Sequence, residues 1–555
     1  MLRFLKRLCR GLLPATAGLL LLSAGAQAHA ATSPLVDAAW LRQALASAQP
    51  PLVLDASPTR LHAAGHIPGA VNADFYRYGS NELDAAGMQA RLRSWGLGQG
   101  ERLIVIHDQG GAMMAPWIFY ELYRHGVAPE RLRLLDGGMA AWKAAQGPIS
   151  TGPSPTPPPG DLRVDSLREG VRARLPEFLA GSGDPQDHAL LEALDPPFYY
   201  GGAKFFNRGG HVPHAKLTPV DDYFRPDKTF KSRAELQAML DHLGVRREQQ
   251  VYSYCGGGVA ASVPYFALKF LLGYPRVALY QGSQKEWLED ARELPLWSYA
   301  NPALLRNADW LNGFSNTMLR TFSHSPISII DIRPDQDYAK GHVPFALSLP
   351  AERFQAGLAA PEQLAALLGR AGVDPQHEAV IVSQGGLNKQ SALVFALLEQ
   401  LGQRKVSFLL ESAEEWEMRG LQLSREPTRV GVRKPPLDPT IAPVDYQARP
   451  GAVLINSAAL AATPPAHGMP RVYLALGSRP PAAELPGKIV HLPYAQLLDA
   501  SGRPKPAHEI WSLLAKAGLP RHAQIVCVAE DFGEAAIGYT LLRLMGFADI
   551  RLAVS

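Results

Sequence analysis

Residues 250–261 read Gln-Val-Tyr-Ser-Tyr-Cys-Gly-Gly-Gly-Val-Ala-Ala, a strand-like stretch that ends in Cys255 and turns through glycines into an apolar segment. That segment, Ala261 to Leu272, is predicted to be a helix with Pro264 in its first turn and Gly273 as its stop. A strand, a tight turn and a helix in succession are typical of parallel βαβ units, where ligands bind at the carboxyl ends of strands. The sequence therefore predicts an α/β fold with Cys255 at such an end.

The glycine-rich turn is suited to hold an anion. Glycines lack a Cβ, so the chain can curl and point successive backbone N–H groups at one atom. These amides and the start of the helix are expected to lower the pKa of the Cys255 thiol and favour the thiolate. An inert, buried cysteine beside a simple turn is the alternative. The predicted anion-binding loop comprises Gly256, Gly257, Gly258, Val259 and Ala260.

The first thirty residues differ in composition from the rest of the chain. Four basic side chains come before an apolar run at 12–22 and small residues at 26–28: Arg3, Lys6, Arg7 and Arg10. This pattern predicts a secretory signal peptide over residues 1–30, cleaved after Ala28 or Ala30. Because the apolar run is too short to span a bilayer comfortably, we expect export to a bacterial periplasm without stable membrane insertion. An uncleaved anchor and secretion beyond the cell are the alternatives.

The length of the chain indicates how many domains it has, and its net charge indicates which partners it can bind. The 555 residues are enough for about four domains. The basic residues of the N-terminal segment account for the whole formal charge of +4, so the remainder is close to neutral. A neutral chain lacks the electrostatic signature of nucleic-acid binding, and no nucleic-acid partner is expected.

Two cysteines remain once the signal peptide is removed. Cys255 and Cys527 lie in different predicted domains and do not suggest a disulfide framework. Cys527 falls within the apolar strand Gln-Ile-Val-Cys-Val-Ala and is expected to be a buried core thiol. Cys255 is therefore the candidate nucleophile.

One pattern recurs four times along the chain, three times clearly. Each clear copy has a strand with an acidic residue at its end, a Gly-His-Xaa-Pro turn, a second strand that enters a loop, and a later tryptophan. The acidic residues are Asp55, Glu192 and Asp331, and the tryptophans are Trp142, Trp287 and Trp416. A weaker fourth copy runs from Val472 to Gly533. Alternating strands and helices in each copy predict four parallel α/β domains.

Proline-rich joints separate the copies. Residues 150–160 are stiff and proline-rich, and residues 425–450 contain several prolines without an apolar period, whereas the joint near 298–311 is less distinct. The predicted domains are residues 31–150, 161–298, 310–425 and 445–555.

The ordered set of acidic strand end, Gly-His-Ile-Pro-Gly-Ala, loop cysteine, and Leu-Asp-Gly-Gly followed by tryptophan resembles the rhodanese sulfurtransferases. This resemblance implies tandem rhodanese-like domains, each a parallel sheet flanked by helices. In that family the active cysteine opens the loop after the central strand. The corresponding position holds, in chain order, Asp108, Cys255, Ser383 and Glu530. The resemblance thus implies an active second domain and inactive first, third and fourth domains.

The loop sequence bears on the substrate that the resemblance implies. Cys-Gly-Gly-Gly-Val-Ala-Ala is similar to the neutral Cys-Gly-Ser-Gly-Val-Thr-Ala type of members that prefer 3-mercaptopyruvate, whereas thiosulfate-preferring members tend to have basic residues there. It departs from that type at Gly257 and Ala260, which lack hydroxyls. Family members hold the substrate carboxylate with arginines before the Gly-His turn, which implies Arg208 and Lys204 here. Solvated surface cations are the alternative.

Three histidines belong to the Gly-His-Xaa-Pro turns. His66 matches a histidine that neutral-loop members place near the active site across the domain interface. For His66, as for His211 and His342, we expect the role of holding the turn together.

The resemblance implies a double displacement. The Cys255 thiolate takes a sulfane sulfur from 3-mercaptopyruvate or thiosulfate as a persulfide and passes it to a thiol or cyanide acceptor, or to a protein acceptor. No metal or organic cofactor is expected. The rival interpretation is a non-enzymatic periplasmic sulfur carrier or docking protein. A cysteine phosphatase of related fold is disfavoured, because it needs a longer loop with an arginine where this chain has Ala261.

Overall fold

A computed structural model of the chain describes residues 33–74, 83–154, 156–315, 317–322, 325–434, 437–449, 451–480 and 485–554. The predicted signal peptide, residues 1–30, lies outside the described residues. Pro34–Ser555 make up one structural unit. Among the described helices, none is long and apolar enough to cross a membrane.

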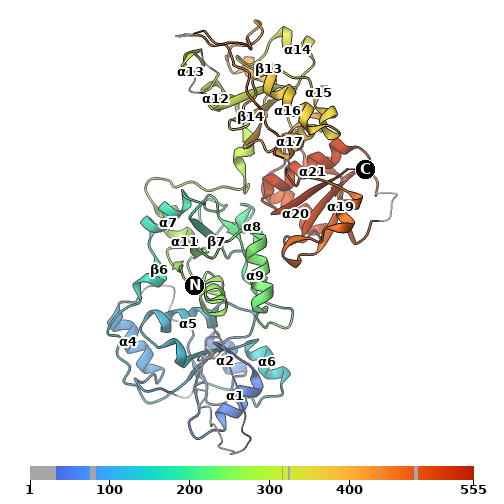
Figure 1. The fold of residues 1–555 in the computed structure, drawn as a ribbon. Helices are drawn as coiled ribbons and strands as arrows, with labels where there is room; N and C mark the ends of the chain where they lie inside the picture. Colours follow the sequence, from blue (N-terminus) through green and yellow to red (C-terminus); the bar gives the residue numbers. More distant parts are fainter. Residues whose placement is uncertain are drawn as a thin grey trace, which may run out of the picture. The chain divides into compact units, whose positions relative to one another are not determined.

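Four parallel five-stranded sheets follow one another along the chain (Figure 1). The strand order of the first sheet, β1-β5-β4-β2-β3, is repeated by the other three sheets with their own strands, which confirms the predicted fold class. The strands are β1 (Leu35–Val36), β2 (Leu52–Asp55), β3 (Val71–Asn72), β4 (Ile104–His107) and β5 (Leu132–Leu135); β6 (Arg172–Ala173), β7 (His188–Glu192), β8 (Lys216–Leu217), β9 (Gln250–Tyr254) and β10 (Val277–Tyr280); β11 (Leu305–Arg306), β12 (Ile327–Asp331), β13 (Leu347–Ser348), β14 (Glu378–Val382) and β15 (Lys405–Leu409); and β16 (Leu454–Asn456), β17 (Arg471–Ala475), β18 (Lys488–His491), β19 (Gln524–Val528) and β20 (Asp549–Val554).

Helices connect the parallel strands and cover the sheets. Central strands such as β4, β14 and β19 are buried along their whole length, as expected for parallel sheets with helices on both faces. The longer helices are α1 (Ala38–Leu45), α2 (Thr59–Ala64), α4 (Ala85–Ser94), α5 (Met114–Arg124) and α6 (Gly138–Ala144); α7 (Leu175–Ser182), α8 (Pro196–Tyr199), α9 (Arg233–His242), α10 (Ser262–Phe266), the π-helix η4 (Ala267–Leu272) and α11 (Ser283–Glu289); α12 (Ala308–Asn312), α13 (Thr317–Thr321), α14 (Asp335–Lys340), α15 (Glu352–Gln355), α16 (Pro361–Arg370), α17 (Lys389–Gln400) and α18 (Ala413–Met418); and α19 (Ser457–Ala462), α20 (Ala507–Lys516) and α21 (Phe532–Met545). Short 3₁₀ turns are η1 (Pro129–Arg131), η2 (Glu169–Val171), η3 (Val220–Tyr223), η5 (Pro302–Leu304), η6 (Ala356–Leu358), η7 (Ala466–Gly468) and η8 (Tyr494–Leu497).

The repeated tryptophans and histidines play the same structural role in each of the first three domains. Each tryptophan is buried and donates its indole N–H to a nearby carbonyl: Trp142 to Pro148 (2.8 Å), Trp287 to Pro295 (3.0 Å) and Trp416 to Gln422 (3.2 Å). Each histidine bonds through Nδ1 to the carbonyl of a residue on whose ring it also stacks: His66 on His62, His211 on Tyr199 and His342 on Tyr338. The prediction that these histidines hold turns together is confirmed.

The four domains form two tandem pairs. One hydrophobic core joins the first and second domains, and another joins the third and fourth. In the first pair α5 packs against α10, and in the second pair α17 packs against α21 at the equivalent place; α17 and α21 lie side by side in Figure 1. The second half of the chain therefore repeats the domain pairing of the first half.

A hairpin from the second domain of each pair reaches the loop of the first. In the second domain, Phe224 pairs with Phe230, and the intervening Lys228 packs so closely on Gly111 that a methyl group there would lie 2.8 Å from Lys228 Cδ. In the fourth domain, the Leu498–Pro504 pair frames an equivalent turn, whose Gly502 carbonyl accepts a hydrogen bond from Leu387 N at 2.8 Å. The loop of the first domain that contains Gly111 is therefore covered by the second domain, and the loop of the third domain that contains Leu387 is covered by the fourth.

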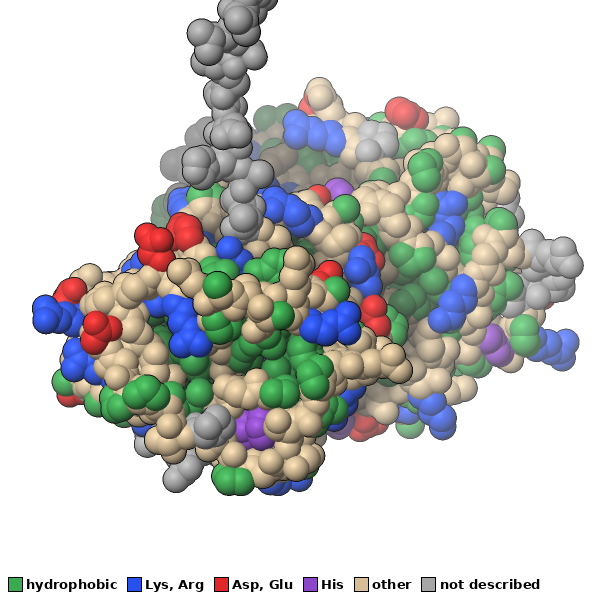
Figure 2. Space-filling model, turned by 90° about the horizontal axis from the view of Figure 1, so that it is seen from below, with side chains coloured by type: hydrophobic (Ala, Val, Ile, Leu, Met, Phe, Trp, Pro, Cys, Tyr) green, Lys and Arg blue, Asp and Glu red, His purple; other side chains and the backbone are tan. Residues whose placement is uncertain are grey.

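One predicted domain limit is wrong. The third domain was expected to begin at residue 310, but β11 (Leu305–Arg306) pairs in register with β15 and so belongs to the third sheet. The remaining limits stay predictions. On the face shown in Figure 2, basic and acidic side chains are interspersed, with hydrophobic side chains between them.

Candidate active site

Cys255 follows β9, the central strand of the second sheet, and opens the loop that leads to α10. The start of α11 holds this loop in place. Cys255 N donates to Ser283 Oγ at 3.1 Å, and Gln284 N donates to the Cys255 carbonyl at 3.0 Å. Lys285 N donates to the Gly256 carbonyl at 3.0 Å. These bonds fix the backbone at the thiol, which is the rigidity that a preorganised site needs.

Backbone amides point at the Cys255 sulfur. Gly258 N lies 3.1 Å from Sγ, and the amides of Gly257, Ala260 and Ala261 also act on the thiol. Of the predicted loop, Gly256 and Val259 contribute carbonyls to neighbouring hydrogen bonds instead, and Ala261 was not among the predicted residues. The predicted amide cradle is therefore present, shifted by one residue toward the helix.

The expected lowering of the Cys255 pKa is not found. Burial is the largest influence and raises the pKa of the thiol, and the four amides only partly oppose it. Only 3% of Cys255 is exposed, so the ionised form loses more hydration than the sequence pattern could reveal. A donor must therefore reach a thiol that is nearly closed off from water.

Phe205 covers the loop and was not predicted as a site residue. Its ring lies 3.2 Å from where a methyl group on Gly256 would sit, and it stacks on Phe198 at 4.2 Å. The ring is 58% exposed, which is unusual for a large aromatic and typical of a binding surface. The only sequence signal was its place in the segment before the Gly-His turn.

The two predicted carboxylate-binding residues lie in that same segment. Arg208 donates through Nη2 to the Leu294 carbonyl at 3.0 Å, so part of its guanidinium supports the backbone. Lys204 is exposed beside Phe205. Neither role in substrate binding is settled by these contacts, and both stay predictions.

A buried polar network lies beside the cysteine. Glu192, at the end of β7, accepts hydrogen bonds from the Tyr254 hydroxyl and from Gln284 Nε2, the latter at 2.8 Å. Val212 N donates to the Tyr254 oxygen at 3.0 Å, and Gln284 Nε2 also donates to the Gly210 carbonyl. Because Tyr254 and Gln284 adjoin Cys255 in sequence and by hydrogen bonding, the network ties the loop to the Gly-His turn.

The equivalent position in the first domain is filled by its own side chain. Both oxygens of the Asp108 carboxylate accept backbone hydrogen bonds, from Gly110 N at 2.8 Å and from Ala115 N at 2.9 Å. The first loop thus has a buried carboxyl group where the second has a thiol. In the third domain, Ser383 lines a pocket of about 320 Å³ with Arg333 and Lys389.

Cys527 is no second nucleophile. It lies within β19 and has no exposed surface, and burial raises the pKa of its thiol. The prediction of a buried core thiol is confirmed.

Gly258 and Gly257 offer a matched pair of substitutions. Gly258 has φ +97°, and a methyl group on it would lie 2.6 Å from the Gln281 carbonyl oxygen, whereas a methyl group on Gly257 meets nothing within 4 Å. We expect Gly258→Ala to move the amide that contacts Sγ and to lower sulfur transfer by about 100-fold. Gly257→Ala should change it by no more than about twofold. Steady-state turnover of both variants checks this, and equal effects would contradict the proposed role of the loop.

Known proteins resemble this chain in three of its four domains. A family model described as "Rhodanese-like domain" matches residues 37–145, 176–290 and 316–419, more than half of the chain. The chain is 30% identical over 278 residues to "Sulfur carrier protein TtuD" of Thermus thermophilus, covering 46% of this chain and 93% of that protein. It is 32% identical over 258 residues to "Probable 3-mercaptopyruvate sulfurtransferase" of Pseudomonas aeruginosa, covering 42% and 84%.

The chain is also similar to a further sulfurtransferase and to a solved structure. The chain is 29% identical over 264 residues to "Thiosulfate sulfurtransferase" of Azotobacter vinelandii, covering 46% of this chain and 95% of that protein. Among solved structures, SseA from Escherichia coli, a 3-mercaptopyruvate sulfotransferase with the "Rhodanese" fold, is 24% identical with a TM-score of 0.41, covering 45% of this chain and 99% of that one.

Proposed function

The chain belongs to the rhodanese family, and on that premise we propose that it is a sulfurtransferase that carries sulfur as a persulfide on Cys255. The observation that carries this proposal is the single loop thiol faced by the amides of Gly257, Gly258, Ala260 and Ala261. Curated relatives named as thiosulfate and 3-mercaptopyruvate sulfurtransferases support the enzyme class.

The proposed reaction has two displacements at sulfur. In the first, the Cys255 thiolate attacks the outer sulfur of the donor, an S–S bond forms, and the donor's bond to that sulfur breaks to release sulfite from thiosulfate or pyruvate, after protonation, from 3-mercaptopyruvate. In the second, a thiol or cyanide attacks the outer sulfur and the Cys255 thiolate leaves. The leaving group carries its electron pair away, whereas the negative charge of the attacking thiolate, of the persulfide and of the thiolate that finally leaves lies at or next to Sγ, where fixed N–H dipoles stabilise it without reorganising.

The loop favours 3-mercaptopyruvate as the donor. Residues 256–261 carry no charge, so the loop offers amides and no cation for the sulfonate end of thiosulfate. A carboxylate donor would then be held by Lys204 and Arg208, in the same segment as the exposed Phe205. We also propose export to the periplasm, from the basic and apolar pattern of residues 1–30.

A sulfur carrier is the second candidate function. Its support is the relative named as a sulfur carrier protein and the lack of hydroxyls at Gly257 and Ala260 of the loop. In that case the persulfide would arrive from a protein partner and be handed on.

The mass of the intact, reduced protein after exposure to each donor tests the proposal. With 3-mercaptopyruvate we expect a gain of one sulfur atom, located on Cys255 by peptide fragmentation, and a smaller yield with thiosulfate. The reverse order would contradict the donor preference. No gain with either donor would contradict the enzyme and favour the carrier, and a gain on Cys527 would refute the assigned site.

A further inference from the structure

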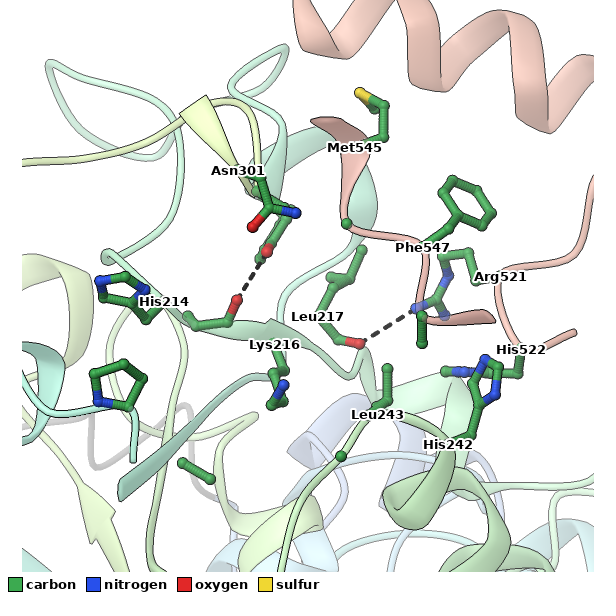
Figure 3. A pocket seen from close by; sticks show the side chains of 18 of the residues that line it. His214, Lys216, Leu217, His242, Leu243, Asn301, Arg521, His522, Met545 and Phe547 are labelled. Carbon is green, nitrogen blue, oxygen red and sulfur yellow. Dashed lines mark hydrogen bonds between the residues drawn. The ribbon is translucent and has the colours of Figure 1, made fainter. Parts of the chain in front are cut away.

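A cationic pocket lies between the second and fourth domains. Its volume is about 520 Å³, and its walls come from β8, the end of α9 and the segments around Arg521 and Met545 (Figure 3). Among the described residues that line it there are four histidines and no Asp or Glu. The lining lysine and arginines are Lys216, Arg246, Arg521 and Arg543. Such a concentration of positively charged side chains is unusual in a chain whose charge after residue 30 is close to neutral.

All three of these arginines have carboxylate partners outside the lining. Arg521 pairs with Asp222, and Arg543 pairs with Glu399 at 2.8 Å. Arg246 pairs with Glu248 at 3.0 Å, but both side chains are largely exposed, and such pairs are weak. These contacts explain how the walls tolerate so much positive charge.

Lys216 is different. Its side chain is half-buried, and no carboxylate among the described residues lies within ion-pair distance of its ammonium group. Burial and then the charge of Arg246 lower its pKa, which is the direction expected for a cation held without a counter-charge. His214, beside it in Figure 3, also has its pKa lowered by burial and by Lys216. Among the described residues, no side-chain carboxylate therefore offsets the charge of Lys216.

A second unsatisfied group faces the same pocket. His242 is only 7% exposed, and its buried Nε2 has no hydrogen-bond partner among the described residues. The same holds for Nδ1 of His522, whose other ring nitrogen bonds to Asp222 at 2.9 Å. Buried polar atoms in folded proteins are nearly always paired, with protein or with something bound. The two rings lie 6.1 Å apart, on opposite sides of the domain boundary.

We propose that this pocket binds a small organic anion that carries more than one carboxylate or phosphate group, with Lys216 as its principal counter-charge. The volume lies in the range of pockets that enclose small molecules and exceeds what a single inorganic ion needs. Tyr199, Tyr200 and Phe547 supply an apolar wall for the carbon skeleton. Since both domains line the pocket, the ligand contacts both, and binding stabilises the native chain by mass action.

Titration calorimetry with two probes tests the proposal on the full mature chain. Citrate serves as the carboxylate probe and inorganic pyrophosphate as the phosphate probe, each at an ionic strength matched with sodium chloride. We expect saturable binding of at least one probe, and the tighter of the two identifies the anionic group that the pocket prefers. Failure of both probes to bind would overturn the proposal.

Three variants locate the binding. Lys216→Gln should weaken the affinity at least tenfold, whereas Lys216→Arg, which keeps the charge, should retain most of it. Lys143→Gln, which removes an exposed lysine of the first domain, should leave the affinity unchanged. Circular dichroism establishes that each variant is folded. Equal affinity of the wild type and Lys216→Gln would place the anion elsewhere and refute the assignment.

Discussion

Replacing Cys255 with serine is expected to abolish sulfur transfer and leave the fold intact. A serine hydroxyl is not ionised near neutral pH and cannot form the S–S bond of a persulfide, so turnover should fall by at least roughly 10³-fold, to the rate without enzyme. The change is nearly isosteric at a site that is 3% exposed, so packing is kept. The loss of turnover is measured as the rate of sulfite release from thiosulfate and of pyruvate release from 3-mercaptopyruvate.

Cys527→Ala is the matched control. It removes the other cysteine of the described residues from a fully buried strand position, far along the sequence from the loop. It should lower stability by about 1 kcal/mol through the small cavity that it leaves, and turnover per folded molecule should stay at the wild-type level. Substantial turnover by Cys255→Ser, or loss of turnover in Cys527→Ala, would refute the assignment of the nucleophile.

The repeated elements of the fold were predictable from the sequence because their chemistry is local. Three elements recur at similar spacing: the strand before each loop, the Gly-His turn and a tryptophan. The tryptophans have the same role in each of the first three domains, since each is buried and donates its indole N–H to a nearby carbonyl: Trp142, Trp287 and Trp416. The position of Cys255 at the end of a central strand follows from the same local pattern.

Contacts between distant segments could not be predicted in this way. The turn at Lys228 that covers Gly111, and the equivalent turn at Gly502, depend on how domains pair. So does the burial of Cys255, which reverses the expected direction of its pKa shift. Phe205 reaches the loop only because its segment folds back over Gly256. Each of these facts depends on tertiary packing, which overrides the local signal.

The acidic residue at the end of the first long strand in each of the first three domains shows how strongly packing decides the chemistry. Burial alone would raise the pKa of Asp55, but the charge of His107 and hydrogen bonds from His62 and Ser57 outweigh it and lower the pKa to about 2. Asp331 pairs with Arg333 at 2.6 Å. Glu192 has only Tyr254 and Gln284 as partners, and burial raises its pKa to about 8. Positions that look alike in sequence therefore have different hydrogen-bond and charge partners in the fold.

The raised pKa of Glu192 predicts that the stability of the folded chain depends on pH. Its pKa is about 8 in the folded chain, against an ordinary value of 4.5, so between these values the folded state keeps a proton that the unfolded state has lost. The contribution is present below pH 4.5 and is lost as the pH rises toward 8. Its size is on the order of 5 kcal/mol of unfolding free energy, at about 1.4 kcal/mol for each unit of pKa difference.

Glu192→Gln removes this titration and keeps the shape, because its amide can still accept from Gln284 and donate to the Tyr254 oxygen. Denaturant unfolding from pH 4.5 to pH 8.5 should show the wild type losing stability relative to Glu192→Gln as the pH rises. Other buried carboxyl groups whose pKa burial raises, such as Asp108 and Glu121, are present in both proteins and cancel in the difference. Glu289→Gln, at an exposed carboxylate of the same domain, should give a constant difference from the wild type. A constant difference for Glu192→Gln as well would mean that Glu192 is ionised in the folded chain, and that a negative charge lies beside the Cys255 thiolate.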